Sequence, residues 1–231
     1  VGGGRGPEQV RTADPATTTS APAPTTTTTS PPAPEPVPAD DALWPPSGRG
    51  FTAPLGAARS FVEEYVGFPD PPLSAFRDDG ESAGEVDVLR VGEGGAVLPG
   101  RVAATVALRL DGTGWVVTGA RSPDIEVDGP RPLDTVGGMF VAEGRSRGYE
   151  GTVVVSVIER GATAAGPLAL VAGIGGAYEM EPFHLDVVLP ARPSAPLGAV
   201  LFTTDTGCDG CNTAFAAVPV RLGTATAGGG A

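Results

Sequence analysis

Thr and Pro dominate residues 12–40, which run TADPATTTSAPAPTTTTTSPPAPEPVPAD. Repeated Pro removes backbone donors and fixes φ, so the tract disfavours both helix and sheet. Residues 1–50 as a whole are mostly Gly, Pro, Thr, Ala and Ser, and they bury too little apolar surface to offset the entropy of ordering the chain. We therefore predict a disordered Gly/Thr/Pro-rich linker over residues 1–50, an extended tether. The Thr clusters are candidate sites for O-glycosylation, and an unmodified spacer is the alternative.

The remaining chain predicts two folded segments and a flexible tail at 223–231. In the first segment, 51–122, Thr52 is expected to cap a helix, which Gly67 ends. The apolar face expected for this helix comprises Leu55, Ala58, Val62, Tyr65 and Val66.

Strands are expected to follow this helix at 85–91, 101–110 and 115–120, with a hairpin turn at 111–114. Trp115 is expected to anchor the core. The pattern predicts a small α+β domain, in which a helix lies on an antiparallel sheet.

Residues 123–222 predict an all-β domain. Short apolar runs alternate with turn residues, without helical periodicity, at 124–128, 139–145, 152–160, 168–174, 182–189, 199–204 and 215–222. Seven strands at this spacing are typical of an immunoglobulin-like β-sandwich.

The same region carries a family resemblance. It rests on Ile125-Glu126-Val127, Pro130, Val136, Phe140-Val141-Ala142-Glu143-Gly144, Tyr149-Glu150-Gly151-Thr152-Val153, the run from Phe183 to Leu189, and Val218-Pro219-Val220-Arg221-Leu222. Residues 123–222 resemble the immunoglobulin-like domain that accompanies GerMN domains in bacterial spore-germination and envelope proteins. The resemblance implies an extracytoplasmic module and supplies no catalytic residues. No GerMN domain is visible upstream, so we carry over no germination role.

Cys208 and Cys211 form the sole Cys motif, Cys208-Asp209-Gly210-Cys211. Asp-Gly favours a tight turn, which would place the two Cys close enough for a disulfide. The alternative is a thioredoxin-type redox site, but such a site needs a helix N-terminus to lower the thiol pKa, and the flanking residues are typical of loops. We predict a structural disulfide.

No other group of residues predicts a catalytic, cofactor or metal site. His184 is the sole His and lacks a nucleophile partner, although Asp186 shares its strand face. A zinc site would lack ligands. Three further patterns are interpreted as surface or turn features: Glu179 with Glu181, the Gly-rich turn at 173–176, and Asp205 with Asp209.

Charge and composition bear on the function class. The formal net charge is −12, and a negative surface repels phosphate backbones, so we expect no nucleic-acid partner. All fifteen basic residues are Arg, which is typical of a high-GC bacterium. The sequence starts without Met, and we expect a removed N-terminal signal or anchor, as in a lipoprotein or membrane-anchored protein. We predict an exported, non-enzymatic binding or accessory protein of the cell envelope, whose partner is an envelope protein or glycan. A thiol-redox protein and a purely structural spacer are the alternatives.

Overall fold

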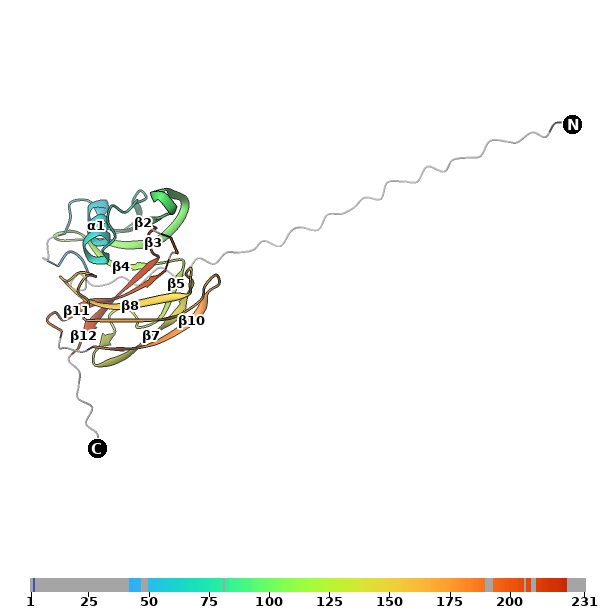
Figure 1. Cartoon of the computed structure of the whole chain (residues 1–231). Coiled ribbons are helices and arrows are strands. Elements are labelled where there is room, and N and C mark those ends of the chain that lie inside the picture. The colour runs from blue at the N-terminus through green and yellow to red at the C-terminus, as the bar shows by residue number, and fades with distance from the viewer. Residues whose placement is uncertain are drawn as a thin grey trace. The chain divides into compact units, whose positions relative to one another are not determined.

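The computed structural model describes Gly2 and residues 42–46, 50–80, 82–189, 193–205, 207–208 and 211–223. Most of the predicted linker and tail lies outside these residues. Val1–Glu35 and Pro36–Ala231 are separate units, and the strands and the helix belong to the second. Within it, α1 and β2–β4 lie at one end, and β7 and β10 lie at the other (Figure 1).

The protein is built mostly of β-strands with a small helical part, as the sequence predicts. The larger sheet has the strand order β1-β2-β3-β4-β12-β11-β8-β9, and β6 pairs in parallel with β12. Its strands are β1 (Arg77–Gly80), β2 (Ala83–Val91), β3 (Val97–Asp111), β4 (Gly114–Arg121), β6 (Thr135–Val136), β8 (Thr152–Glu159), β9 (Ala169–Ile174), β11 (Leu197–Thr204) and β12 (Phe215–Leu222). The smaller sheet has the order β10-β7-β5, formed by β10 (Glu181–Val188), β7 (Met139–Ser146) and β5 (Ile125–Gly129).

The seven strands predicted between residues 123 and 222 are all present, with ends within two residues of those expected. The hairpin turn at 111–114 is also confirmed, because Asp111 pairs with Gly114. The short strands β1 and β6 and the 3-10 turn η3 (Glu93–Gly95) were not predicted from the sequence.

The helical part differs in detail from the prediction. It consists of α1 (Pro54–Ser60) and a π-helical continuation, η2 (Phe61–Val66), which ends at Gly67 with φ of 85°. Thr52 is not the cap, since Ala53 holds that position without a side-chain bond. The buried residues of this part are Ala57, Ala58, Phe61, Val62 and Tyr65. Leu55, expected in the core, is 42% exposed, whereas Phe61 is fully buried.

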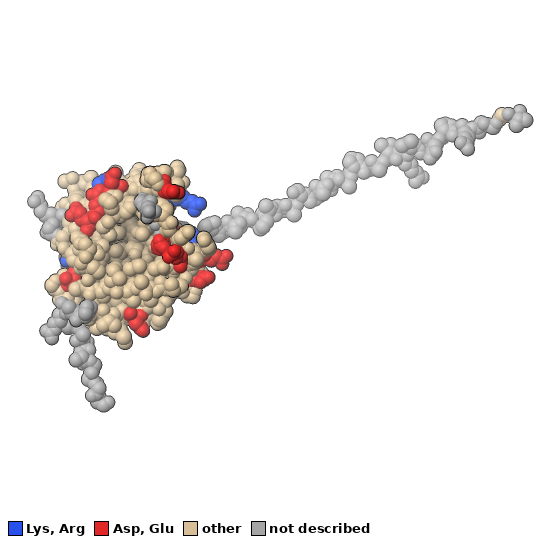
Figure 2. Space-filling view, viewed as in Figure 1, with Lys and Arg blue, Asp and Glu red and all other residues tan. Residues whose placement is uncertain are grey.

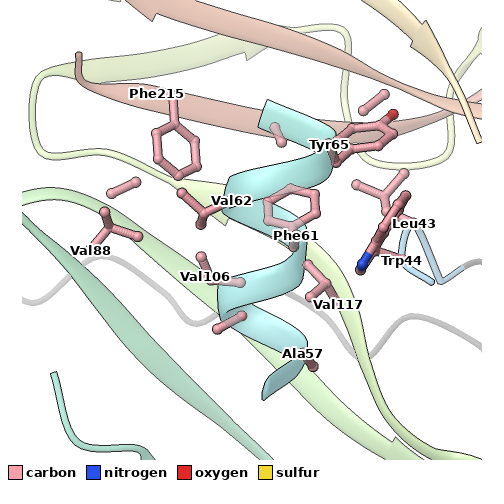
Figure 3. Close-up of a cluster of buried hydrophobic side chains, with 14 of the residues drawn as sticks. Leu43, Trp44, Ala57, Phe61, Val62, Tyr65, Val88, Val106, Val117 and Phe215 are labelled. Atoms are coloured by element: carbon pink, nitrogen blue, oxygen red, sulfur yellow. The ribbon is translucent and has the colours of Figure 1, made fainter. Parts of the chain in front are cut away.

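Two hydrophobic clusters occupy opposite faces of the larger sheet. The first, the helix-side core, lies between the helical part and the sheet (Figure 3). The second, the sandwich core, lies between the two sheets and includes Phe183 and Phe202. Strand β11 contributes to both cores, since Leu201 faces the helix side and Phe202 faces the sandwich. Successive side chains of a strand point to opposite faces, so β8, β11 and β12 are buried on both sides.

The chain just before the helix belongs to the fold. Leu43 is fully buried and Trp44 is 6% exposed, and Trp44 lies beside Tyr65 (Figure 3). The Leu43 N–H donates to the Val117 carbonyl at 2.8 Å, and the Val117 N–H donates to the Trp44 carbonyl at 2.8 Å. Residues 42–46 are therefore part of the folded structure and not of the linker predicted to reach residue 50.

Trp115 is partly buried and packs edge-on against Phe76, with ring centroids 5.0 Å apart. It contacts the helix-side core, in agreement with the anchoring role expected for it. Among the described residues, no helix combines the length and the apolar character that crossing a bilayer requires.

The opposite face of β2 and β3 carries an ion-pair network. Arg77 bonds Asp87 with both terminal nitrogens, and the Thr105 hydroxyl donates to Asp87 at 2.7 Å. Arg121 donates to Glu85 at 2.7 Å on the same face. Burial raises the pKa of Asp87, but the hydrogen bonds from Arg77 and Thr105 outweigh it and hold that pKa below its usual value.

Replacing Asp87 by Asn is expected to lower the free energy of unfolding by about 1–3 kcal/mol at pH 7, because bonds to a charged acceptor are lost. The folded-state pKa lies below the unfolded value of about 3.9, so this stabilisation is complete above pH ~4 and disappears as the pH falls through the folded-state pKa. Urea unfolding at a series of pH values measures it. The exposed neighbour Asp79→Asn is the control, and a difference that grows on acidification would contradict the assignment.

Candidate functional site

The predicted disulfide is present between Cys208 and Cys211, whose Cα atoms lie 5.6 Å apart. The Cys211 N–H donates to the Cys208 carbonyl at 3.4 Å, which closes a tight turn. Asp209 and Gly210 lie outside the described residues. The turn sits within the longer β11–β12 connection, since β11 ends at Thr204 and β12 starts at Phe215. The two Cys therefore lie in the connection between β11 and β12, which we call the disulfide loop (205–214).

Asn212 attaches this loop to the end of β2. Its side chain is 2% exposed, donates from Nδ2 to the Leu89 carbonyl at 2.7 Å, and accepts the Val91 N–H at 2.7 Å on Oδ1. An Asn amide that satisfies one buried acceptor and one buried donor fixes the position of both segments. Sequence reasoning missed Asn212, because its partners lie about 120 residues away.

The Asp124 carboxylate binds two Arg side chains near the loop. Arg90 pairs with Asp124, whose side chain is 14% exposed, and Arg147 donates from Nε to Asp124 at 2.7 Å. Arg90 also donates to the Asn212 carbonyl at 3.3 Å. The end of β2, the segment before β5 and the disulfide loop are thereby joined by charge-assisted hydrogen bonds.

The other end of the loop packs against Tyr149. Gly207 has φ of 67°, and a Cβ built on it would lie 2.1 Å from the Tyr149 ring. The Tyr149 N–H donates to the Asp205 carbonyl at 3.2 Å, and the Gly207 N–H donates to the Asp205 carboxylate at 2.9 Å. Asp205, interpreted in the sequence as a surface or turn feature, orders the turn with its carboxylate.

Two hollows open on either side of the disulfide. The first, of about 570 Å³, is lined by Cys211, Arg59, Phe68, Pro69, Asp70, Pro71, Pro72, Val91, Gly95 and Val97. The second, of about 550 Å³, is lined by Glu93, Asp205, Gly207 and Cys208, and is more polar. The hairpin between β2 and β3 lines both hollows. Each Cys thus lines a different depression, and both depressions are open to solvent.

The remaining candidate residues are not brought together with this loop. His184 is exposed and pairs across the sheet with Glu143, its Nδ1 lying 3.2 Å from a carboxylate oxygen. Asp186 is also exposed, on the same face of β10. Glu179 and Glu181 are exposed near the start of β10. Of the residues interpreted as a Gly-rich turn, Gly173 and Ile174 belong to β9, so that strand continues into the predicted turn. Within the described ranges, no group of three or more His, Cys, Asp or Glu is placed to hold a metal ion.

Comparison with known proteins adds no relative: no family model, no curated protein and no solved structure matches this chain. The resemblance of residues 123–222 to the immunoglobulin-like domain associated with GerMN domains stays a prediction.

Proposed function

We propose that this chain is an exported, non-enzymatic binding or accessory protein of the bacterial cell envelope, which holds an immunoglobulin-like domain on a tether. The observation that supports this most is the strand order. We letter the strands from β5 to β12 as A, A′, B, C, C′, E, F and G in chain order. The smaller sheet then has the order A-B-E. The larger sheet contains the run G-F-C-C′, with A′ beside G. Immunoglobulin-like sandwiches divide their strands in the same way, with C′ beside C in the sheet that contains F and G.

Two features favour export. The Cys208–Cys211 bond is the kind of cross-link that persists in oxidising compartments outside the cytoplasm. The Thr/Pro-rich tract is a composition typical of extended spacers, which carry a domain away from its point of attachment.

The geometry of the disulfide loop favours binding. Loops at the ends of a sandwich are where such domains make contacts, and a loop held in one conformation loses less entropy when a partner docks. The hydrogen bonds of Asn212 to β2, and of Arg90 to the Asn212 carbonyl, fix the position of this loop, and Asp124 pairs with Arg90. The first hollow offers Phe68 and three Pro side chains as a rigid apolar surface beside the Arg59–Asp70 ion pair. An envelope protein or a glycan is the partner class that we propose.

The thiol-redox alternative has less support. A reactive Cys-x-x-C needs a helix N-terminus beside the first thiol, and none of the described residues flanking Cys208 is helical. His184 lies on the smaller sheet, where it pairs with Glu143 of β7.

A variant pair tests the proposed binding surface. Val97 lines the first hollow and is 45% exposed, so Val97→Glu is expected to fold normally and to lower capture of the envelope partner at least tenfold. The measurement is cross-linking pull-down from intact envelopes with the full chain as bait. The control Val188→Glu introduces the same charge at a 59% exposed position of β10 and is expected to bind as the wild type does.

Equal capture by both variants, or none by the wild type, would remove the binding role. The redox alternative predicts insulin reduction that is abolished by Cys208→Ser, whereas a binding module gives only background reduction.

A further inference from the structure

Strand β9 forms an edge of the larger sheet, and β10 of the smaller sheet packs against it at Gly173 without pairing with it. Strand β9 is the last strand in the described sheet order and pairs with β8 alone. Residues 168–178, LALVAGIGGAY, contain neither a charge nor a Pro. Natural proteins usually protect such edges with Lys, Pro or bulges, because an open edge pairs with other strands. Nor does β9 carry a register shift that would twist the edge away.

The hydrogen-bonding groups and the side chains of this edge follow the same alternation. Thr152 pairs with Ile174, and the Gly175 N–H donates to the Gly151 carbonyl at 2.7 Å. This bond marks Thr152–Ile174 as a non-hydrogen-bonded pair, so the N–H and C=O groups of Leu170, Ala172 and Ile174 point away from β8. The same three residues expose their side chains, with Leu170 64% and Ile174 73% exposed.

We propose that β9 pairs with β9 of a second copy of this chain, in antiparallel register about a two-fold axis through Ala172. In that register Ala172 lies opposite Ala172 of the second copy, and Leu170 lies opposite Ile174 on each side. Three hydrogen-bonded pairs would use the outward N–H and C=O groups of both strands. The cross-strand Leu–Ile pairs would cover the most exposed apolar side chains of β9, while the small Ala side chains meet at the axis.

The charge distribution favours a second copy at this edge. Two chains of net charge −12 repel each other, and they approach at least cost where neither carries charge. Residues 168–178 carry no charged side chain, and Figure 2 shows an uncharged area on one face of the molecule with acidic groups around it. A single pair of short strands buries less than the about 1,200 Å² of a standard interface, so we expect a weak dimer with a dissociation constant on the order of 10–100 µM.

Sedimentation of the full chain between about 1 and 500 µM measures this association. The wild type is expected to pass from monomer to dimer over that range. Ala172→Glu places two carboxylates face to face at the axis and is expected to weaken the dimer at least tenfold. The control Met139→Glu introduces the same charge at a 69% exposed site on β7 and should leave the dimer unchanged. A wild type that stays monomeric, or a dimer insensitive to Ala172→Glu, would overturn the proposal.

A pair of double variants tests the register itself. Leu170→Lys with Ile174→Lys sets like charges opposite each other, whereas Leu170→Lys with Ile174→Glu sets opposite charges there. Both lose the same apolar contacts. The Lys/Glu variant is expected to dimerise at least fivefold more tightly than the Lys/Lys variant at low salt, with the gap closing as salt is added. Equal association of the two would exclude this register. The outcome is independent of the binding role of the disulfide loop, which lies on other residues.

Discussion

Phe202→Ala is expected to lower the free energy of unfolding by about 3–5 kcal/mol, a large part of the stability of an ordinary domain. The Phe202 side chain is fully buried in the sandwich core, with its ring centroid 5.8 Å from that of Phe183. Removing the ring leaves a cavity between two sheets, and β11 cannot shift to fill it. Leu201, on the other face of β11, is packed in the helix-side core and holds the strand in place.

The same coupling predicts how this variant unfolds. Both Trp side chains of the protein, Trp44 and Trp115, lie in or against the helix-side core, on the other face of the sheet from Phe202. If β8, β11 and β12 unite the two cores, Phe202→Ala lowers the urea midpoint of Trp fluorescence and of far-UV circular dichroism equally. Met139→Ala, at an exposed position of β7, is the control and should change stability by no more than about 0.5 kcal/mol. An unchanged Trp midpoint beside a two-step dichroism curve would instead show two units that unfold separately, divided near residue 122.

Asn212→Ala is expected to cost about 2–4 kcal/mol, since it leaves the Leu89 carbonyl and the Val91 N–H without their buried partner. The substitution should lower the stability of the whole domain and also loosen the structure around Val91. Hydrogen exchange of the Val91 amide is expected to accelerate at least tenfold under native conditions, because its acceptor is removed.

The neighbouring Thr213→Ala serves as the matched control, since Thr213 is only partly buried. It should leave Val91 exchange near the wild-type rate. A further variant, Asn212→Asp, keeps an acceptor for Val91 but removes the donor to Leu89, and should protect the amide while still lowering stability. If Asn212→Ala and Thr213→Ala behave alike, Asn212 does not hold the loop.

The strands between residues 123 and 222 were predictable because each is short, apolar and bounded by turn residues. The helix was predictable as an element, but its buried face was not. The α-helical period that predicts Ala58, Val62 and Tyr65 on the buried face also places Leu55 there, but Leu55 lies in the first turn of α1 and is exposed, whereas Phe61 is buried. The order of the strands in the sheets could not be predicted either, because sequence periodicity does not show which strand lies beside β4 or β9.

The candidate site was predictable only where its chemistry is local. A four-residue Cys pair can be recognised by its spacing, and the bond between Cys208 and Cys211 is confirmed. Asn212, Arg90 and Asp124 act through partners that the chain brings together from distant positions. Single polar residues of this kind carry no spacing signal, so nothing in the sequence distinguished them from surface residues.

The pairing of Leu43, Trp44 and Phe51 with β4 has a mechanical consequence. Any tension on the chain upstream of Ala42 arrives at the hydrogen bonds between Leu43, Trp44 and Val117. The next interactions to resist the force are the backbone hydrogen bonds between Phe51 and Trp115. The Trp44 indole N–H also donates to the Ser60 hydroxyl at 2.9 Å. Force on the tether would therefore have to break the hydrogen bonds of Leu43, Trp44 and Phe51 to β4, and pull Trp44 away from Tyr65, before it reached the helix. The resistance of the domain to force is set at this attachment, far from the disulfide loop in sequence.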